Sequence, residues 1–282
     1  MKVIDIHPHV MSPDRDRYPL SPAFDHVAPY VAERPISAEM MLADMEAAGI
    51  AQSVLVHSTM AYGYNNSYAA DAAAAYPERF ASVGSIDVRA ADAPERLRYW
   101  IRERGMNGMR IFTSGGTMAE DSDYLDDPAT FGVWEMAREL GIPVCLQMRT
   151  GGFGRLTALL ERFPEVPMII DHLARPPAED GPPYLAAAAL WKLAAAPNVY
   201  LKLTTNNFRE FGKGKGTVQS FVQRCVDLFG SNRIAWGSNY PSSPGPLSKL
   251  VEQAKRELSF LSPRDQEQIF SGTAQTLYPT LA

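Results

Sequence analysis

The sequence predicts an α/β fold, a (β/α)8 TIM barrel built as a single domain over residues 1–282. Eight short apolar runs alternate with eight or more helical segments, and this count and the chain length both fit such a barrel. The apolar runs are almost continuous, as parallel strands covered on both faces require. A doubly wound open sheet would place a glycine-rich phosphate turn after the first strand, and the sequence has none there. No linker divides the chain.

The predicted strands are apolar runs bounded by turn residues or breakers. In the first of them side chains should alternate between faces, so that Asp5, His7 and His9 share one side and the two isoleucines between them the other. The eight predicted strands are Val3–Val10, Ser53–His57, Phe80–Val88, Gly108–Phe112, Pro143–Met148, Met168–His172, Val199–Thr204 and Arg233–Asn239.

Capping residues and breakers mark the predicted helices. Ser37 is a suitable N-cap for the first helix and Gly49 a suitable end. The long segment before it, Met11–Pro35, is rich in Pro, Asp and Tyr; we predict a loop, and loops of such length in compact domains tend to be functional. The predicted helices lie within residues 37–49, 66–75, 92–105, 127–140, 155–163, 184–196, 217–229, 247–260 and 263–270.

Composition and charge exclude several classes of protein. The formal net charge of −5, with no cluster of Lys and Arg, argues against a nucleic-acid partner. No apolar run approaches the roughly 20 residues of a membrane-spanning helix, so we expect no membrane partner. The sequence starts directly in a strand, without a charged leader and an apolar segment, which predicts a cytoplasmic protein. Cys145 and Cys225 lie in apolar segments and are expected to be reduced core residues.

In a barrel of this type the chemistry sits at the carboxyl ends of the strands. Four of the five histidines fall there, and only His26 lies in a loop. A His-x-His pair at the end of the first strand favours a catalytic or metal-binding edge over a pair of packing residues. On the seventh strand, Lys202 points into the barrel mouth or caps an outer helix, and we favour the mouth. The polar residues at the strand ends are His7, His9, His57, Arg110, Gln147, His172, Lys202 and Asn239.

Three segments resemble the amidohydrolase superfamily. They are Ile-Asp-Ile-His-Pro-His in the first strand, Ile-Ile-Asp-His-Leu-Ala-Arg-Pro ending at Pro176, and Ile-Ala-Trp-Gly-Ser-Asn-Tyr-Pro ending at Pro241. They are most similar to the amidohydrolase-2 branch, which includes 2-pyrone-4,6-dicarboxylate lactonases and sugar lactonases. The Tyr-Gly-Tyr-Asn-Asn turn ending at Asn66 adds to the match, and the resemblance covers the chain end to end. It implies an enzyme of the hydrolase class.

The sequence departs from the family pattern at two metal-ligand positions. Metal-dependent members carry a His at the end of strand five, where this chain has Gln147, and an Asp at the end of strand eight, where it has Asn239. An amide is a poor zinc ligand and cannot accept a proton from water. The lactonase branch is associated with metal-independent catalysis, so we expect no cofactor. A zinc or manganese ion held by His7, His9 and His172, with water completing the shell, is the alternative.

The leading hypothesis is a hydrolase of a small cyclic ester, a lactone that carries a carboxylate or several hydroxyls. A neutral histidine is the best candidate for the base, because its ordinary pKa lies near working pH, and His7, His9 and His57 are all placed for this role. His7, His9 and His172 would polarise the carbonyl. Asn239 would orient a water or donate a hydrogen bond to the carbonyl oxygen.

Basic residues at the strand ends favour a small anionic substrate, because a planar guanidinium suits a carboxylate. Arg110 would hold the anion, whereas Arg175 either contacts the substrate, pairs with Asp171 or caps a helix. The aromatic and amide-rich segment after the second strand is either a solvated turn or a ligand-facing lid. The predicted substrate-binding residues are Arg110, Tyr62, Tyr64, Asn66, Gln147, Lys202 and Arg175.

Two other functions stay open at this stage. A decarboxylase or other carbon–carbon lyase acting on an aromatic or muconate-like acid resembles the same branch and would need the metal ion. A non-catalytic barrel that lost its base would bind a small molecule without turnover. Barrels of this family often form homodimers, although no residue of this sequence identifies an interface.

Overall fold

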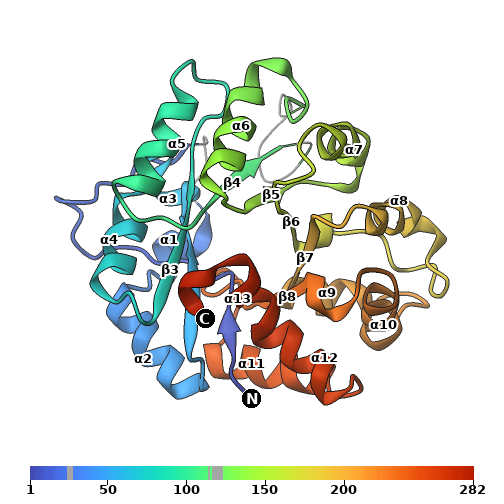
Figure 1. Ribbon diagram of the computed structural model, residues 1–282. Coiled ribbons are helices and arrows are strands. Elements are labelled where there is room, and N and C mark those ends of the chain that lie inside the picture. Colours follow the sequence, from blue (N-terminus) through green and yellow to red (C-terminus); the bar gives the residue numbers. More distant parts are fainter. Residues whose placement is uncertain (24–27, 114, 116–122) are drawn as a thin grey trace.

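The computed structural model describes residues 1–23, 28–113, 115 and 123–282, and its eight strands form one parallel sheet in chain order. The amide of Ile6 donates to the carbonyl of Trp236 at 3.2 Å, which brings the first strand against the last. Figure 1 shows the strands at the centre and the helices around them. The predicted barrel is confirmed. The strands are β1 (Ile4–Asp5), β2 (Gln52–Val56), β3 (Phe80–Ser85), β4 (Gly108–Phe112), β5 (Val144–Gln147), β6 (Met168–Asp171), β7 (Val199–Thr204) and β8 (Ile234–Gly237).

Helices cover the outer face of the barrel (Figure 1). The predicted caps form: Ser37 Oγ accepts the amide of Met40, and Gly49 ends that helix with a left-handed φ of 67°. No helix in the described ranges is long and apolar enough to cross a membrane. The helices are α1 (Pro29–Glu33), α2 (Ala38–Ala48), α3 (Thr59–Tyr62), α4 (Ser67–Ala75), α5 (Ala93–Arg102), α6 (Phe131–Leu140), α7 (Phe153–Arg162), α8 (Ala188–Lys192), α9 (Thr205–Phe211), α10 (Val218–Phe229), α11 (Leu247–Glu257), α12 (Pro263–Glu267) and α13 (Thr273–Leu277).

Several short helices differ from the prediction. The segment Met11–Pro35 is not loop throughout, because it contains α1, and the sequence also gave no indication of α3, α9 and α13. These helices have only 4 to 7 residues, too few for a helical period to show. The helix predicted over residues 184–196 is reduced to α8, with 3₁₀ turns at Leu185–Ala187 and Leu193–Ala195.

The first strand is shorter than predicted. Asp5 Oδ1 accepts the backbone amides of His7 at 3.0 Å and Ser238 at 2.8 Å, so the His7 amide is used by a side chain instead of the strand ladder. The predicted alternation therefore holds for Ile4 and Ile6, which share a face, and is wrong from His7 onward, because His7 also lies in the barrel interior, beside His172. Ile4 and Ile6 pack together in the barrel interior, and His7 is fully buried as well.

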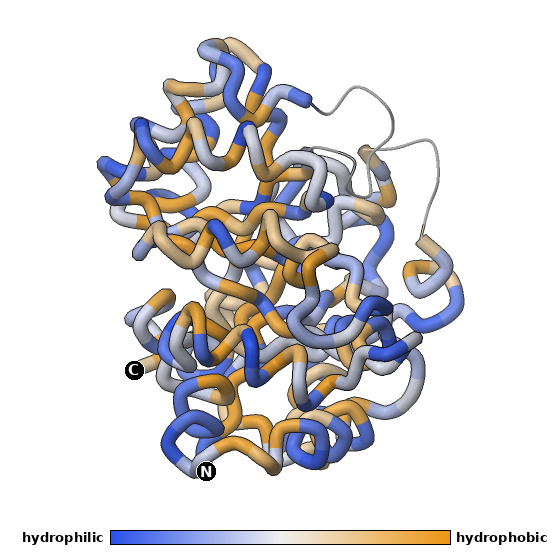
Figure 2. Tube along the Cα trace, turned by 90° about the vertical axis from the view of Figure 1, so that its right-hand side faces the viewer, coloured by the Kyte–Doolittle hydropathy of each residue, from blue (hydrophilic) through white to orange (hydrophobic). Residues whose placement is uncertain are grey.

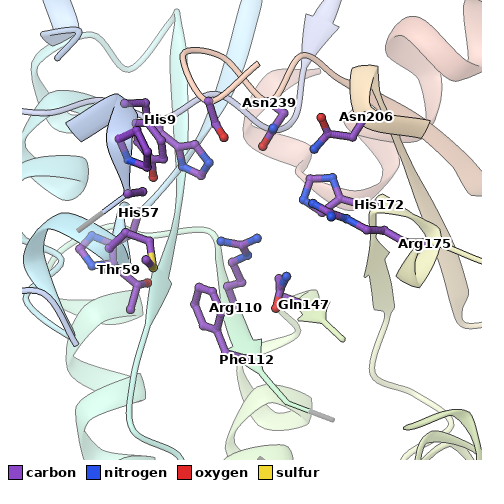
Figure 3. A pocket seen from close by; sticks show the side chains of 15 residues that line it. His9, His57, Thr59, Arg110, Phe112, Gln147, His172, Arg175, Asn206 and Asn239 are labelled. Atoms are coloured by element: carbon purple, nitrogen blue, oxygen red, sulfur yellow. The ribbon is translucent and has the colours of Figure 1, made fainter. Parts of the chain in front are cut away.

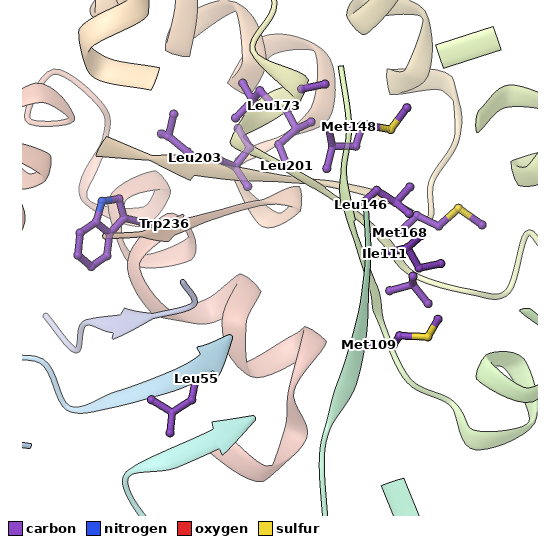
Figure 4. Close-up of a cluster of buried hydrophobic side chains, with 14 of the residues drawn as sticks. Leu55, Met109, Ile111, Leu146, Met148, Met168, Leu173, Leu201, Leu203 and Trp236 are labelled. Carbon is purple, nitrogen blue, oxygen red and sulfur yellow. The ribbon is translucent and has the colours of Figure 1, made fainter. Parts of the chain in front are cut away.

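Apolar side chains form two layers, one on each face of the strands. The outer layer, which includes Leu55, Leu146 and Trp236, lies between the strands and the helices (Figure 4). The inner layer fills the barrel and contacts α13 and the turn Pro279–Leu281, which cover one end of it. In Figure 2 hydrophobic colour is concentrated on the central strands and hydrophilic colour recurs along the outer segments. The carboxyl end of the barrel is thus the end left for a site.

We expect Leu281→Ala to lower the free energy of unfolding by about 2–3 kcal/mol, because this buried side chain packs in the inner layer and its loss leaves a cavity. Urea unfolding followed by circular dichroism measures the change. Leu185→Ala is the matched control, since Leu185 is 73% exposed, and it should change the value by less than about 0.5 kcal/mol. Equal effects of the two variants would show that the C-terminal turn is not part of the core.

Candidate active site

A cavity of about 240 Å³ lies where the carboxyl ends of the strands meet. Its size suits a small molecule. Figure 3 shows side chains from several strands and the loops that follow them directed into one space. The residues that line the cavity are His9, Ala28, Pro29, Tyr30, His57, Thr59, Met60, Arg110, Phe112, Gln147, His172, Arg175, Asn206, Asn239 and Ser242.

Hydrogen bonds fix the proton on two of the cavity imidazoles. His9 Nδ1 lies 2.8 Å from the carbonyl oxygen of Val56, which only accepts, so Nδ1 carries the proton. His172 Nδ1 lies 2.7 Å from Thr204 Oγ1, and this hydroxyl donates in turn to Asn207 Oδ1 at 3.2 Å. Thr204 therefore accepts from His172. In both rings Nε2 keeps its lone pair, and each can take a proton from a molecule in the cavity.

The cavity histidines are uncharged at neutral pH. Burial, which disfavours the charged imidazolium, lowers the pKa of His9 and of His172 to about 3 and the pKa of His57 to about 4, and the positive charge of Arg110 lowers all three further. His57 donates from Nε2 to the carbonyl of Gly63 at 2.7 Å and keeps its lone pair on Nδ1. These imidazoles are therefore unprotonated at neutral pH. Their pKa values lie well below the working pH that made a histidine the expected base, so each is a weaker proton acceptor than a free imidazole.

A buried cluster of charged side chains extends from Arg110, which lines the cavity, into the barrel interior. Asp171 Oδ2 accepts a hydrogen bond from Arg110 Nε at 2.7 Å, and Lys202 Nζ lies 2.8 Å from Asp171 Oδ1. Burial alone would raise the pKa of Asp171, but the charges of Lys202 and Arg110 outweigh it and hold the pKa well below its ordinary value. The three residues therefore carry one net positive charge.

A left-handed turn sets the direction of two cavity residues. The four residues from His172 to Arg175 have φ values of 54°, 53°, 57° and 50°, and none of them is glycine. Each such residue costs roughly 1–2 kcal/mol, and the Asn207 side chain holds the turn by donating to the carbonyl of His172 at 2.8 Å. His172 and Arg175, at the two ends of the turn, both line the cavity.

The structure brings most of the predicted site residues together. Those that line the cavity are His9, His57, Arg110, Gln147, His172, Arg175 and Asn239. Arg175 does not pair with Asp171; its Nε lies 3.8 Å from Oε1 of Glu210. His26, predicted in a loop, lies outside the described residues.

Two predicted site residues lie deeper, below the cavity. Lys202 is fully buried and pairs with Asp171, so it does not reach the barrel mouth. His7 is fully buried with its ring centroid 4.8 Å from that of His172, and within the described residues neither of its ring nitrogens has a hydrogen-bond partner. A Cβ on Gly237 would lie 2.6 Å from the Cβ of His7, so glycine is required for this close approach.

The predicted lid after the second strand is not part of the cavity lining. Tyr62 lies in α3, and its hydroxyl accepts the backbone amide of Ser12 at 2.8 Å. Asn66 is fully buried and bridges the amide and carbonyl of Ser85, at 2.7 and 2.9 Å. Tyr64 is half-buried outside the cavity. These contacts place the turn in a structural role in this conformation.

Four polar cavity residues were missed by the sequence analysis: Thr59, Ser242, Tyr30 and Asn206. Tyr30, from α1, stacks on His9 with ring centroids 5.7 Å apart and planes at 17°. Asn206 is in α9, directly after β7. The signals for Tyr30 and Asn206 were present: the unusual length of the segment Met11–Pro35, and the run of four Thr and Asn residues that follows Leu203.

A barrel whose strand ends carry histidines and arginines around one cavity is an arrangement found in amidohydrolases, and the comparison with known families agrees. The amidohydrolase family profile matches residues 4–280, so the chain belongs to this family. The predicted resemblance is confirmed.

Two curated relatives act on lactones according to their names. The chain is 28% identical over 242 residues to L-fucono-1,5-lactonase from Burkholderia ambifaria, covering 82% of this chain and 80% of that protein. It is 27% identical over 245 residues to 4-sulfomuconolactone hydrolase from Rhizobium radiobacter, covering 85% and 75%. Among solved structures, a putative 2-pyrone-4,6-dicarboxylic acid hydrolase from Pseudomonas putida has the same fold, with 21% identity, a TM-score of 0.78 and coverage of 100% and 98%.

Structures of this fold include one that holds zinc, so we tested whether the residues of this chain fit a divalent ion. In the described part of the chain no three His, Cys, Asp or Glu side chains are placed to hold one. The unpartnered nitrogens of His7 would suit an ion. However, Arg110 and Lys202 are near enough to lower the pKa of His7, and together they more than balance the charge of Asp171. Imidazoles alone can hold zinc, but here the net positive charge of the neighbouring Arg110, Lys202 and Asp171 would repel a divalent ion, so the described residues fit such an ion poorly.

The cavity histidines make a pH-dependent stability expected. Their pKa values are lower in the folded protein than the ordinary 6.5, so between about pH 4 and 6.5 the unfolded chain binds more protons than the folded one. The contribution is complete above about pH 6.5 and is lost as the pH falls, with a slope of up to about 1.4 kcal/mol per pH unit for each histidine. Urea unfolding at several pH values measures this slope.

His57→Gln is the variant that attributes the slope to the cavity. It should reduce the dependence of the free energy of unfolding on pH by about one proton, whatever its effect on stability at neutral pH. An unchanged slope in this variant would mean that His57 is not neutral in the folded state.

Proposed function

We propose that this protein hydrolyses a small lactone that carries a carboxylate, without a bound metal ion. The observation that carries the proposal is the charge of the cavity: Arg110 and Arg175 line it, and none of its described lining residues is a carboxylate. The names of the two curated relatives support a lactone as the substrate class, and the sulfo group in one of them is anionic. The two imidazole lone pairs that face the same cavity supply a base for hydrolysis.

The lining residues divide the steps of hydrolysis between them. The Arg110 guanidinium, directed into the cavity in Figure 3, binds the substrate carboxylate. Nε2 of His9 or of His172 takes a proton from water, whose oxygen attacks the carbonyl carbon. The Asn239 amide donates to the carbonyl oxygen as negative charge develops there. The ring C–O bond then breaks, and the imidazolium returns its proton to the leaving oxygen, which yields a hydroxy acid.

This assignment changes two roles predicted from the sequence. A neutral His9 or His172 with its Nε2 lone pair in the cavity cannot donate a hydrogen bond from that atom, so we assign the polarising role to the Asn239 amide and the proton transfer to an imidazole. Asn239 has no basic lone pair near neutral pH, which leaves the base to the histidines.

A panel of small molecules tests the proposal. It contains a γ-lactone with a ring carboxylate, the carboxamide of the same lactone, L-fucono-1,5-lactone and a dihydroxybenzoate; acid release and mass spectrometry report ring opening, and carbon dioxide release reports decarboxylation. We expect the carboxylated lactone to be opened with a kcat/KM at least about tenfold above its carboxamide, because the carboxylate gains an arginine partner. Carbon dioxide release alone would favour the decarboxylase, and binding without turnover a non-catalytic barrel.

Histidine variants locate the base in the same assay. His9→Gln and His172→Gln are compared, and the one that removes the base should lower kcat by about 10²–10⁴-fold. Arg264→Gln, an exposed residue of α12, is the control and should leave the kinetics unchanged. Full activity in both histidine variants would contradict the assigned mechanism.

The metal content of protein purified without chelator is a separate prediction. Because the cluster below the cavity is already cationic, we expect far less than one equivalent of zinc or manganese by elemental mass spectrometry. Lactone opening should be unaffected by dialysis against a chelator. If the protein contains one equivalent of metal, and dialysis against a chelator removes the metal and the activity together, hydrolysis without a metal ion is ruled out.

A further inference from the structure

Lys202 is a charged side chain that the proposed mechanism does not use. It is fully buried in the barrel, and it is not one of the residues that line the cavity. Its Nζ lies 2.8 Å from Asp171 Oδ1 and donates to Cys145 Sγ at 3.3 Å. A buried ammonium is costly unless it is paired, so its position needs a reason beyond packing.

Asp171 links Lys202 to the cavity. Its second oxygen, Oδ2, accepts Arg110 Nε at 2.7 Å, and the outer end of that guanidinium points toward the space between His9, His172 and Asn239 in Figure 3. The other groups that face Asp171 are the imidazoles of His7, with Nδ1 at 3.9 Å, and of His172. Burial lowers the pKa of both, so they are neutral at neutral pH.

The charges in this cluster decide what Arg110 offers to a ligand. A single carboxylate bound to a single arginine forms a neutral pair, and such an arginine attracts a further anion weakly. Here Lys202 also balances the charge of Asp171, so the cluster keeps one net positive charge at its cavity end. Besides Asp171, Arg110 also contacts the neutral Phe112 ring, whose centroid lies 4.6 Å from Cζ. In a buried site this difference is large, because charges are screened little by water.

We propose that Lys202 is a positioning residue that sets the preference of the cavity for anions by balancing Asp171. The cluster then keeps one net positive charge, and Arg110, still paired with Asp171, presents it to the substrate carboxylate. For the identity of the substrate this inference rests on the proposed function. The preference for an anion can nevertheless be measured by binding alone, without turnover.

The experiment compares two probes that contain no ester bond, tetrahydrofuran-2-carboxylate and its neutral carboxamide. Their dissociation constants are measured at neutral pH by NMR titration, in the unsubstituted protein and in Lys202→Met. We expect the dissociation constant of the carboxylate to rise at least about tenfold in the variant and that of the carboxamide to change less than about twofold. Near-ultraviolet circular dichroism checks that the variant is folded, and Lys202→Gln replaces it if it is not.

A charge-compensated variant separates this role from a purely structural one. Lys202→Met combined with Asp171→Asn removes one charge of each sign and leaves Arg110 unbalanced again, so the carboxylate affinity should recover most of what the single variant lost. Cys145→Ala removes the neutral neighbour of Lys202 and no charge, and it should leave the preference for the carboxylate unchanged.

Each outcome distinguishes between the claims. An equal loss of affinity for both probes in Lys202→Met would overturn the inference and leave Lys202 a structural residue. So would a double variant that does not regain affinity for the carboxylate. The expected binding pattern in a protein that opens no lactone would support the role of Lys202 and refute the proposed function.

Discussion

The buried carboxylate of Asp171 is the group on which the rest of the site depends. Without partners this carboxylate could not stay ionised inside the barrel. Its partners come from two other strands, Arg110 from β4 and Lys202 from β7. The excess positive charge of this cluster adds to burial in keeping the imidazoles above it neutral. One ion cluster therefore links three strands, the protonation state of the candidate bases and the sign of the ligand that the cavity favours.

Much of the fold could be predicted because its signals are local. Apolar runs, an N-cap such as Ser37 and a left-handed glycine such as Gly49 each act within a few residues, and all are visible in the sequence. The errors arose where distant contacts decide. The carboxylate of Asp5 binds the amide of Ser238, from the other end of the chain, and thereby ends β1 early. The short helices are similar, since their stability comes from packing and not from a periodic pattern.

The sequence predicted at which end of the barrel the site lies. It did not predict how deep in the barrel each polar side chain would be. The rule that chemistry sits at strand ends found His9, His172 and Asn239, which all line the cavity. The rule did not distinguish these residues from Lys202, whose side chain also faces the barrel interior but is fully buried and does not line the cavity. Tyr30 lies in the short helix α1 of the long segment Met11–Pro35. The length of that segment indicated a functional role, but how it folds back over the barrel, and so which of its residues reaches the cavity, depends on distant contacts.

The two cavity arginines lie at different depths. They would therefore affect different steps of ligand binding, Arg175 the association rate and Arg110 the dissociation rate. Arg175 has a side chain 35% exposed and lies near Glu210, so bulk ions screen its field. For the proposed anionic substrate it would act mainly on the association rate. Arg110 is almost fully buried, where salt hardly penetrates, and it acts mainly on the residence time. Rising ionic strength should therefore lower the association rate of an anionic ligand more than it raises the dissociation rate. A bound anion would then stay bound at salt concentrations that already screen the long-range attraction.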